Sequence, residues 1–422
     1  MELQRQWFNV RFRNFFIFLI VLWSILLSKT VYFGIINRKP YQWVFYLLAL
    51  VCVLFFKLSI QRIKVNTIIA LPMLILLLMN LIFNKSDMTS SQTNLVTGIV
   101  LTLIAMAFIA SYMDKAKFAA MYIRIIAVFS CISLPSFLIA NINPSLAFRF
   151  CQPGYDWTVS FGYSMFYTWG RAGTIYNRNS GPFWEPGAFL GFIMIAFFML
   201  LYECDEKELK HRKLYFVLFV ITMLTTQSTT GYILMILIFL SQWNQIQKIF
   251  GRMNKVLKYL MITIIAVTTI LVIFQTGNIS GKLSGASSAS ATIRSSDFSG
   301  GLKLILKSGI IGLGETATKE ANKQIAGVGV DDSIGLFAMA YTYGIMFAII
   351  YIFNAFKGIK RFFKPDNSKD MLILSFVFIV LNMTEGLWWL PVFVAILFRF
   401  GEKISQTNSY VSDTINLQGK AT

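Results

Sequence analysis

Long apolar runs alternate with short polar segments along the chain. A run of about 20 apolar residues crosses roughly 30 Å of hydrocarbon as an α-helix. Two pairs of runs, 214–227 with 229–243 and 371–384 with 386–400, are short and closely linked, so the number of helices depends most on them. The pattern predicts an all-α polytopic integral membrane protein with twelve transmembrane helices, near residues 14–36, 41–60, 66–83, 94–113, 118–140, 182–203, 214–227, 229–243, 257–275, 333–353, 371–384 and 386–400.

Composition supports this class, because 56% of the 422 residues are hydrophobic and only 14% are charged. Lys and Arg accumulate in the cytoplasmic loops of membrane proteins. The net charge of +19 is therefore attributed to topology and to contact with anionic lipids rather than to a nucleic-acid partner. A single frame, with the N-terminus inside, places the basic segments in the cytoplasm: 57–64, 115–117, 207–213, 248–258 and 357–369.

The first apolar run follows Arg5, Arg11 and Arg13, as the apolar part of a signal peptide would. It is too long for a cleaved signal, and no small-residue cleavage site follows it. We therefore expect a retained signal anchor, with both termini in the cytoplasm.

The same frame puts two long segments outside the membrane, and long loops often carry function. The expected organisation is helices 1–5 in residues 1–140, a first extracytoplasmic loop at 141–181, helices 6–9 in 182–275, a second extracytoplasmic loop at 276–332, and helices 10–12 with a cytoplasmic tail in 333–422.

The first long loop interleaves Arg149, Arg171 and Arg178 with aromatic residues. Aromatic rings stack on sugars, and arginine forks bind phosphate in a bidentate manner. An interfacial aromatic belt with arginines that bind lipid headgroups fits the same composition. Both interpretations stay open at this point.

The second long loop begins with a Ser/Gly/Ala-rich stretch, residues 280–301, which we expect to be flexible. The following "LKLILKSGIIGLGE", residues 302–315, predicts a short interfacial or re-entrant helix. A mobile loop with one docked end suggests a lid over an external cavity.

Several chemistries are excluded by the residues available. The only histidine, His211, falls in a predicted cytoplasmic loop, and the four cysteines lack the paired spacing of a zinc site or a disulfide framework. A Ser-His-Asp triad would need an external histidine. No metal or other cofactor is expected. External acid–base chemistry would have to use one of six carboxylates: Glu185, Asp297, Glu315, Glu320, Asp331 or Asp332.

Four segments resemble a known family. "RNSGPFWEPGAFLG", residues 178–191, resembles the segment that introduces a central transmembrane helix in Wzy-type polymerases of O-antigens and capsular polysaccharides, where an Arg, a Gly, an aromatic residue and Glu-Pro-Gly recur. "TQSTTGYI" at 226–233, "ATIRSSDFSGGLKLILKSGIIGLGE" at 291–315 and "DDSIGLFAMAYTYGI" at 331–345 are similar to later segments of that family. The resemblance covers about residues 140–350 and implies a GT-C-like fold of the O-antigen polymerase/ligase superfamily.

The resemblance implies a polymerase at the outer face of the bacterial cytoplasmic membrane. Its substrates would be oligosaccharide repeat units on undecaprenyl pyrophosphate, joined into O-antigen, capsule or exopolysaccharide by metal-independent glycosyl transfer. Membrane lipids, a chain-length regulator and a flippase would be its partners. Arg178 and Arg294, supported by Arg171, would stabilise the pyrophosphate leaving group, and Trp184 and Tyr232 would line the substrate site.

A carboxylate would accept the proton of the attacking hydroxyl. Asp332 stands where the related ligases carry a histidine, so we expect it to be the base; a plain helix N-cap is the alternative. Glu185, at a helix start, suits orienting Arg178 better than proton transfer, and a structural salt bridge to an external arginine is its alternative.

Two other functions stay open. An O-antigen ligase is disfavoured by the missing external histidine. A lipid-linked oligosaccharide flippase or other transporter would more often carry charges within its spans, where this chain has few, such as Lys29 and Arg124.

Overall fold

The structure is a computed structural model. It describes residues 2–28, 30, 38–55, 59–84, 90–149, 152–155, 160–163, 168–171, 178–205, 207–251, 255–275, 288–326 and 335–402.

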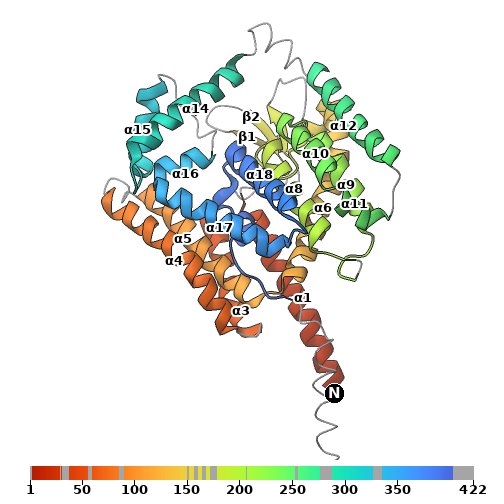
Figure 1. Cartoon of the computed structure of the whole chain (residues 1–422), viewed down its shortest axis with the longest axis horizontal. Coiled ribbons are helices and arrows are strands. Elements are labelled where there is room, and N and C mark those ends of the chain that lie inside the picture. The colour runs from red at the N-terminus through yellow and green to blue at the C-terminus, as the bar shows by residue number, and fades with distance from the viewer. Residues whose placement is uncertain are drawn as a thin grey trace, which may run out of the picture.

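Helices make up nearly all of the described chain (Figure 1). The first half contains α1 (Glu2–Leu26), α3 (Arg38–Phe55), α4 (Ile60–Phe83), α5 (Ser90–Tyr112), α6 (Lys115–Ile142), α7 (Pro144–Arg149), α8 (Pro186–Tyr202) and α9 (Arg212–Thr225). The second half contains α10 (Thr229–Ser241), α11 (Trp243–Phe250), α12 (Lys255–Gln275), α14 (Ser288–Ser308), α15 (Gly314–Ala326), α16 (Gly335–Tyr343), α17 (Ile345–Phe363), α18 (Ser368–Glu385), the 3₁₀ turn η2 (Leu387–Trp389) and α19 (Pro391–Ala395).

Within the described residues, three helical segments are long and apolar enough to cross a membrane: Ile60–Phe83, Leu95–Tyr112 and Lys115–Ile142. The pair α10 and α11, bent by 76°, gives a fourth if it counts as one span. The structure thus supports a helical membrane protein with three or four candidate spans and does not show twelve. Several helices fall short of the length required. At 1.5 Å per residue, the 13 residues of α10 reach only about 20 Å.

Four helices run between two opposite ends of the bundle. At one end, Lys115 at the start of α6 pairs with Glu203 just after α8 and donates to the carbonyl oxygen of Phe362 near the end of α17. At the other end, Gly187 in the first turn of α8 contacts Glu385, the last residue of α18. We call the first the ionic end and the second the motif end, because the segment 178–191 lies there.

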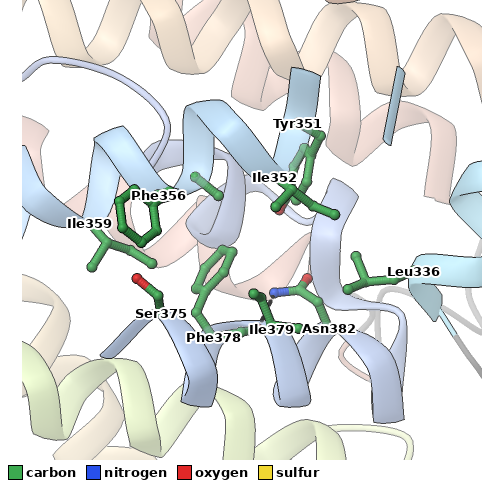
Figure 2. A pocket seen from close by; sticks show the side chains of 10 residues that line it. Leu336, Tyr351, Ile352, Phe356, Ile359, Ser375, Phe378, Ile379 and Asn382 are labelled. Atoms are coloured by element: carbon green, nitrogen blue, oxygen red, sulfur yellow. Dashed lines mark hydrogen bonds between the residues drawn. The ribbon is translucent and has the colours of Figure 1, made fainter. Parts of the chain in front are cut away.

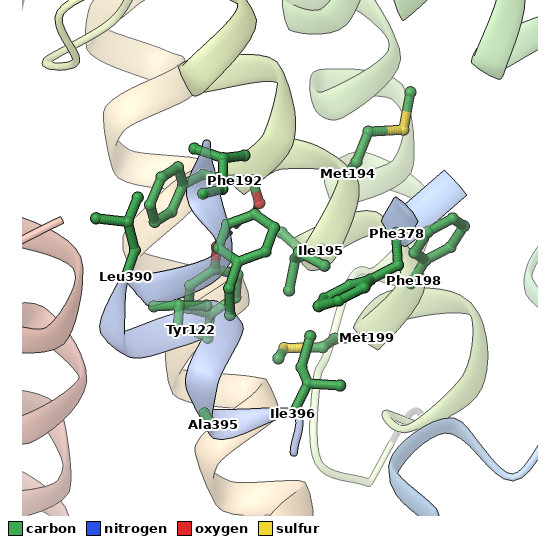
Figure 3. Packing of buried hydrophobic residues seen from close by; sticks show 14 of the residues in the cluster. Tyr122, Phe192, Met194, Ile195, Phe198, Met199, Phe378, Leu390, Ala395 and Ile396 are labelled. Atoms are coloured by element: carbon green, nitrogen blue, oxygen red, sulfur yellow. Dashed lines mark hydrogen bonds between the residues drawn. The ribbon is translucent and has the colours of Figure 1, made fainter. Parts of the chain in front are cut away.

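Helix α8 forms the centre of the bundle. Every residue from Gly187 to Leu201 is buried, as expected for a helix that is apolar on all sides. The hydroxyl of Tyr122 in α6 donates to the carbonyl oxygen of Phe192, 3.0 Å away. Figure 3 shows α8 side chains packed against α6, α18 and the segment after η2, through Phe192, Ile195, Phe198, Met199, Tyr122, Phe378, Leu390 and Ile396. This packing fixes where α8 starts, and therefore where the motif end lies.

The first long loop has more regular structure than its sequence suggested. Helix α6 continues to Ile142, and α7 follows directly. The next residues form a three-stranded antiparallel sheet in the order β1 (Gln152–Tyr155), β2 (Ser160–Tyr163) and β3 (Thr168–Arg171).

The second long loop also differs from expectation. Helix α14 already begins at Ser288, so the prediction of flexible chain is wrong for residues 288–301. The reason is tertiary: the Phe298 ring packs 5.2 Å from the Phe337 ring of α16, and Leu304 is buried beside Tyr341. The short helix predicted after residue 301 is the second part of α14. In Figure 1, α14 and α15 lie at the top of the view, at one side of the bundle.

Candidate functional site

The segment 178–191 is anchored by aromatic packing. Thr30, just after α1, forms an isolated antiparallel bridge with Phe183. The Phe183 ring stacks on Phe192, with 4.3 Å between ring centroids, and on Phe189. Gly181 has φ +50°, and a Cβ atom there would lie 2.7 Å from the Phe189 ring. The Gly and Phe of the sequence pattern therefore have a structural role: they hold the segment onto the start of α8.

Arg178 and Asn179 attach this segment to the end of α9. Arg178 Nε donates to the carbonyl oxygen of Thr226 at 3.1 Å. The Asn179 side chain donates to Thr225 Oγ1 at 2.8 Å and to Ser133 Oγ at 3.1 Å, and its backbone N–H donates to the Thr225 carbonyl oxygen. Asn179 is fully buried, whereas Arg178 is exposed. Sequence reasoning missed Asn179, which fixes the backbone from which Arg178 reaches the surface.

Tyr232, in the first turns of α10, is buried near the end of α9. Its hydroxyl donates to the carbonyl oxygen of Leu224 at 2.7 Å, and the residue is only 1% exposed. The structure therefore places Tyr232 in the interior, whereas Arg178 reaches the surface.

Glu185 is the N-cap residue of α8 and is exposed. Its carboxylate makes no capping hydrogen bond and instead accepts one from the indole Nε1 of Trp184 at 2.6 Å. Arg178 and Glu185 both have described side chains, and no salt bridge joins the two. The described geometry thus pairs Glu185 with Trp184.

Sequence reasoning missed Glu385. A Cβ atom on Gly187 would collide with the Glu385 carboxylate, so this side chain lies directly against the first turn of α8. Glu385 was overlooked because it falls in the short break between two apolar runs. A carboxylate followed by Gly386, in the short break between two apolar runs, was the available signal.

The structure describes the other predicted site residues, Arg171, Arg294 and Asp332, only in part or not at all. Arg171 ends β3, where its backbone pairs with Phe161, and Arg294 lies in α14; the structure describes their backbone only. Asp332 lies outside the described residues. The next described residue after it, Gly335, begins α16 and packs against the end of α18.

The turn 309–314 between α14 and α15 is docked by hydrogen bonds from side chains of α4 and α16. Asn80 at the end of α4 donates to the carbonyl oxygen of Ile311 at 2.7 Å. The Tyr343 hydroxyl donates to the Glu315 carboxylate at 2.6 Å. These contacts give the glycine-rich turn a structural role at the motif end.

The ionic end contains an open cavity of about 450 Å³. Lys115 and Glu203 are buried, with side chains 10% and 6% exposed. Burial raises the pKa of the Glu203 carboxyl to about 7, against the opposing effect of Lys115. Three salt bridges between described side chains line this cavity: Lys115–Glu203 at 2.8 Å, Lys248–Asp366 at 2.7 Å and Lys364–Glu402 at 3.1 Å.

A second cavity is a narrow apolar crevice between α17 and α18, shown in Figure 2. Its volume of about 20 Å³ is close to that of one water molecule. Within the described part of the chain, Tyr351 Oη, Ser375 Oγ and Asn382 Oδ1 have no hydrogen-bond partner there. The crevice is too small for a saccharide, so it is not the candidate site.

Among the described residues, no group of three or more His, Cys, Asp or Glu side chains could hold a metal ion. Comparisons with protein-family models, with curated proteins and with solved structures found no match to this chain.

Proposed function

We propose that this protein is a polysaccharide polymerase that joins oligosaccharide repeat units carried on undecaprenyl pyrophosphate. One observation carries the proposal: two segments that resemble the Wzy-type family, 178–191 and 226–233, meet at the motif end. Arg178 donates to the carbonyl oxygen of Thr226, the first residue of the second segment. The two segments therefore form one site, with an exposed arginine at its surface.

Arg178 suits the charge chemistry of this reaction. The bond between the anomeric carbon and the pyrophosphate breaks, and negative charge develops on the leaving oxygen. A guanidinium fork donates to such an oxygen, and each charge-assisted hydrogen bond contributes roughly 1.5 to 3 kcal/mol. We assign this role to Arg178, with Arg171 and Arg294 as further donors, and Trp184 to the wall of the substrate site.

The donor is the growing glycan on its lipid pyrophosphate, and the acceptor is one further repeat unit on the same kind of carrier. One hydroxyl group of the acceptor reacts. The hydroxyl oxygen attacks the anomeric carbon as the pyrophosphate leaves, and a carboxylate accepts the hydroxyl proton. The sequence nominates Asp332 and Glu185 for this step. No nucleotide is needed, because the lipid pyrophosphate supplies the leaving group.

The proposed arrangement has the motif end outside the membrane. Lys248 and Lys364, from segments predicted to be cytoplasmic, both lie at the ionic end. The proposed bundle of twelve adds nine further segments to the three long candidate spans: α1, α3, α8, α9, α10, α12, α16 with α17, α18, and η2 with α19. A chain-length regulator and a flippase are the proposed protein partners.

The proposal is tested in the native host by removing the protein. Loss of a polymerase leaves single lipid-linked repeat units and abolishes longer chains, and the full chain supplied in trans restores them. Long chains that remain on the lipid carrier would identify a ligase instead. Repeat units trapped on the cytoplasmic leaflet would identify a transporter.

A further inference from the structure

Glu385 lies about 35 residues beyond the region that carries the family resemblance, yet its carboxylate reaches the centre of the motif end. It occupies the space that a side chain at position 187 would fill. The glycine of Glu-Pro-Gly therefore leaves room for a carboxylate from another helix.

The position of Glu385 is fixed by its backbone. Gly386 has φ +57°, which ends α18 directly after Glu385. A Cβ atom on Gly335, at the start of α16, would collide with the Cα atom of Gly386. The end of α18 is thus held by α16 on one side while the Glu385 side chain faces α8 on the other. Such a constraint preorganises a reacting group.

The half-buried Glu385 carboxylate lies between two helix ends. Glu385 is the last residue of α18, and its carboxylate lies against the first turn of α8. A general base has to accept a proton during the reaction, and a carboxylate held in one place by its backbone suits that step.

Glu185 is exposed at the start of α8, and its carboxylate accepts a hydrogen bond from the Trp184 indole. This position suits a carboxylate that holds a neighbouring side chain.

We infer that Glu385 is the general base that activates the acceptor hydroxyl, an inference that rests on the proposed function. The hydroxyl oxygen forms a bond to the anomeric carbon, and the bond from that carbon to the pyrophosphate oxygen breaks with its electron pair going to the oxygen. The hydroxyl proton passes to the Glu385 carboxylate, which later releases it to water.

The test uses the purified full-length protein and lipid-linked single repeats extracted from host cells that lack it. Glu385→Gln keeps the shape of the side chain but cannot accept the proton. We expect its turnover to fall roughly 10²- to 10⁴-fold with little change in KM. In the wild type, turnover should fall at low pH as the base is protonated. In Glu385→Gln that acidic limb should disappear from the remaining activity.

Gly187→Ala provides a second, independent variant. The added methyl group displaces the Glu385 carboxylate without removing it, so turnover should fall as well. Combining it with Glu385→Gln should add little, because both changes act on one group. Gly98→Ala is the matched control, since its Cβ atom would meet only ordinary contacts.

Arg178→Ala separates the two levels of inference. If Glu385→Gln turns over within about threefold of the wild type while Arg178→Ala is inactive, the assignment of Glu385 is wrong and the polymerase proposal stands. Full loss in Asp332→Asn combined with normal turnover in Glu385→Gln would also overturn it. If host cells without the protein hold no single repeats, the polymerase proposal itself fails.

Discussion

The two ends of the bundle use charge differently. At the ionic end, Lys115 and Glu203 form a buried pair between α6 and α8. At the motif end, Arg178 and Glu185 are exposed; Arg178 donates to a backbone carbonyl oxygen, and Glu185 accepts from an indole. A buried ion pair thus joins helices at the ionic end, whereas the motif end presents charged side chains at its surface. Substitutions at the first end should affect stability, and those at the second should affect activity.

The largest expected difference between the ends is their exposure to the outside of the cell. Ser145 in α7 and Ser368 at the start of α18 are both exposed. In a background with Cys131 and Cys151 replaced, a cysteine at position 145 should react with a membrane-impermeant reagent in whole cells, and one at 368 only after lysis. The opposite pattern would invert the proposed topology.

Removing one partner of the buried ion pair should give the largest change in stability. Glu203→Leu leaves the Lys115 ammonium group buried without its carboxylate, which costs about 3 to 5 kcal/mol. The double variant with Lys115→Met should recover most of the loss. Thermal unfolding of the purified protein measures both. A single variant as stable as the wild type would show that the pair contributes little to folding.

The same carboxyl group predicts a pH dependence of stability. The folded protein binds the Glu203 proton more tightly than the unfolded chain, because its pKa is raised from 4.5 to about 7. Its contribution to stability is complete below about pH 4.5 and is lost as the pH rises through 7. The melting temperature should therefore fall between pH 5.5 and 8.

Glu203→Gln should flatten this slope, whereas Glu402→Gln should retain it. Hydrogen bonding to Lys364 lowers the pKa of Glu402, so its contribution changes only in more acidic solution. An equal slope in the wild type and in Glu203→Gln would assign the pH dependence to another group.

The smallest effect is expected at the exposed pair of the ionic end. The Lys248 and Asp366 side chains are 55% and 53% exposed. A pair of this kind contributes about 0 to 1 kcal/mol. Asp366→Asn should shift the melting temperature by no more than a few degrees and should leave the turnover unchanged. A large loss of turnover would show that the chemistry also depends on the ionic end.

The sequence predicted the features that depend on local pattern. The apolar run 182–203 contains α8, and Arg178 lies just before it, at the motif end. Features that depend on tertiary contacts were missed. Helix α14 forms in a Ser/Gly/Ala-rich stretch because Phe298 packs on α16, and Glu385 joins the site because Gly187 leaves room for it. The roles of Arg171, Arg294 and Asp332 stay predictions.

The most direct test of the account compares one arginine with one lysine from the opposite end. Arg178→Ala and Lys248→Ala each remove a cation, and both are measured in the native host at matched membrane expression, by polysaccharide chain length and by the pool of single repeat units. We expect Arg178→Ala to make almost no chains and accumulate single repeats, Arg178→Lys to retain part of the activity, and Lys248→Ala to match the wild type. Full-length chains from Arg178→Ala would contradict the account.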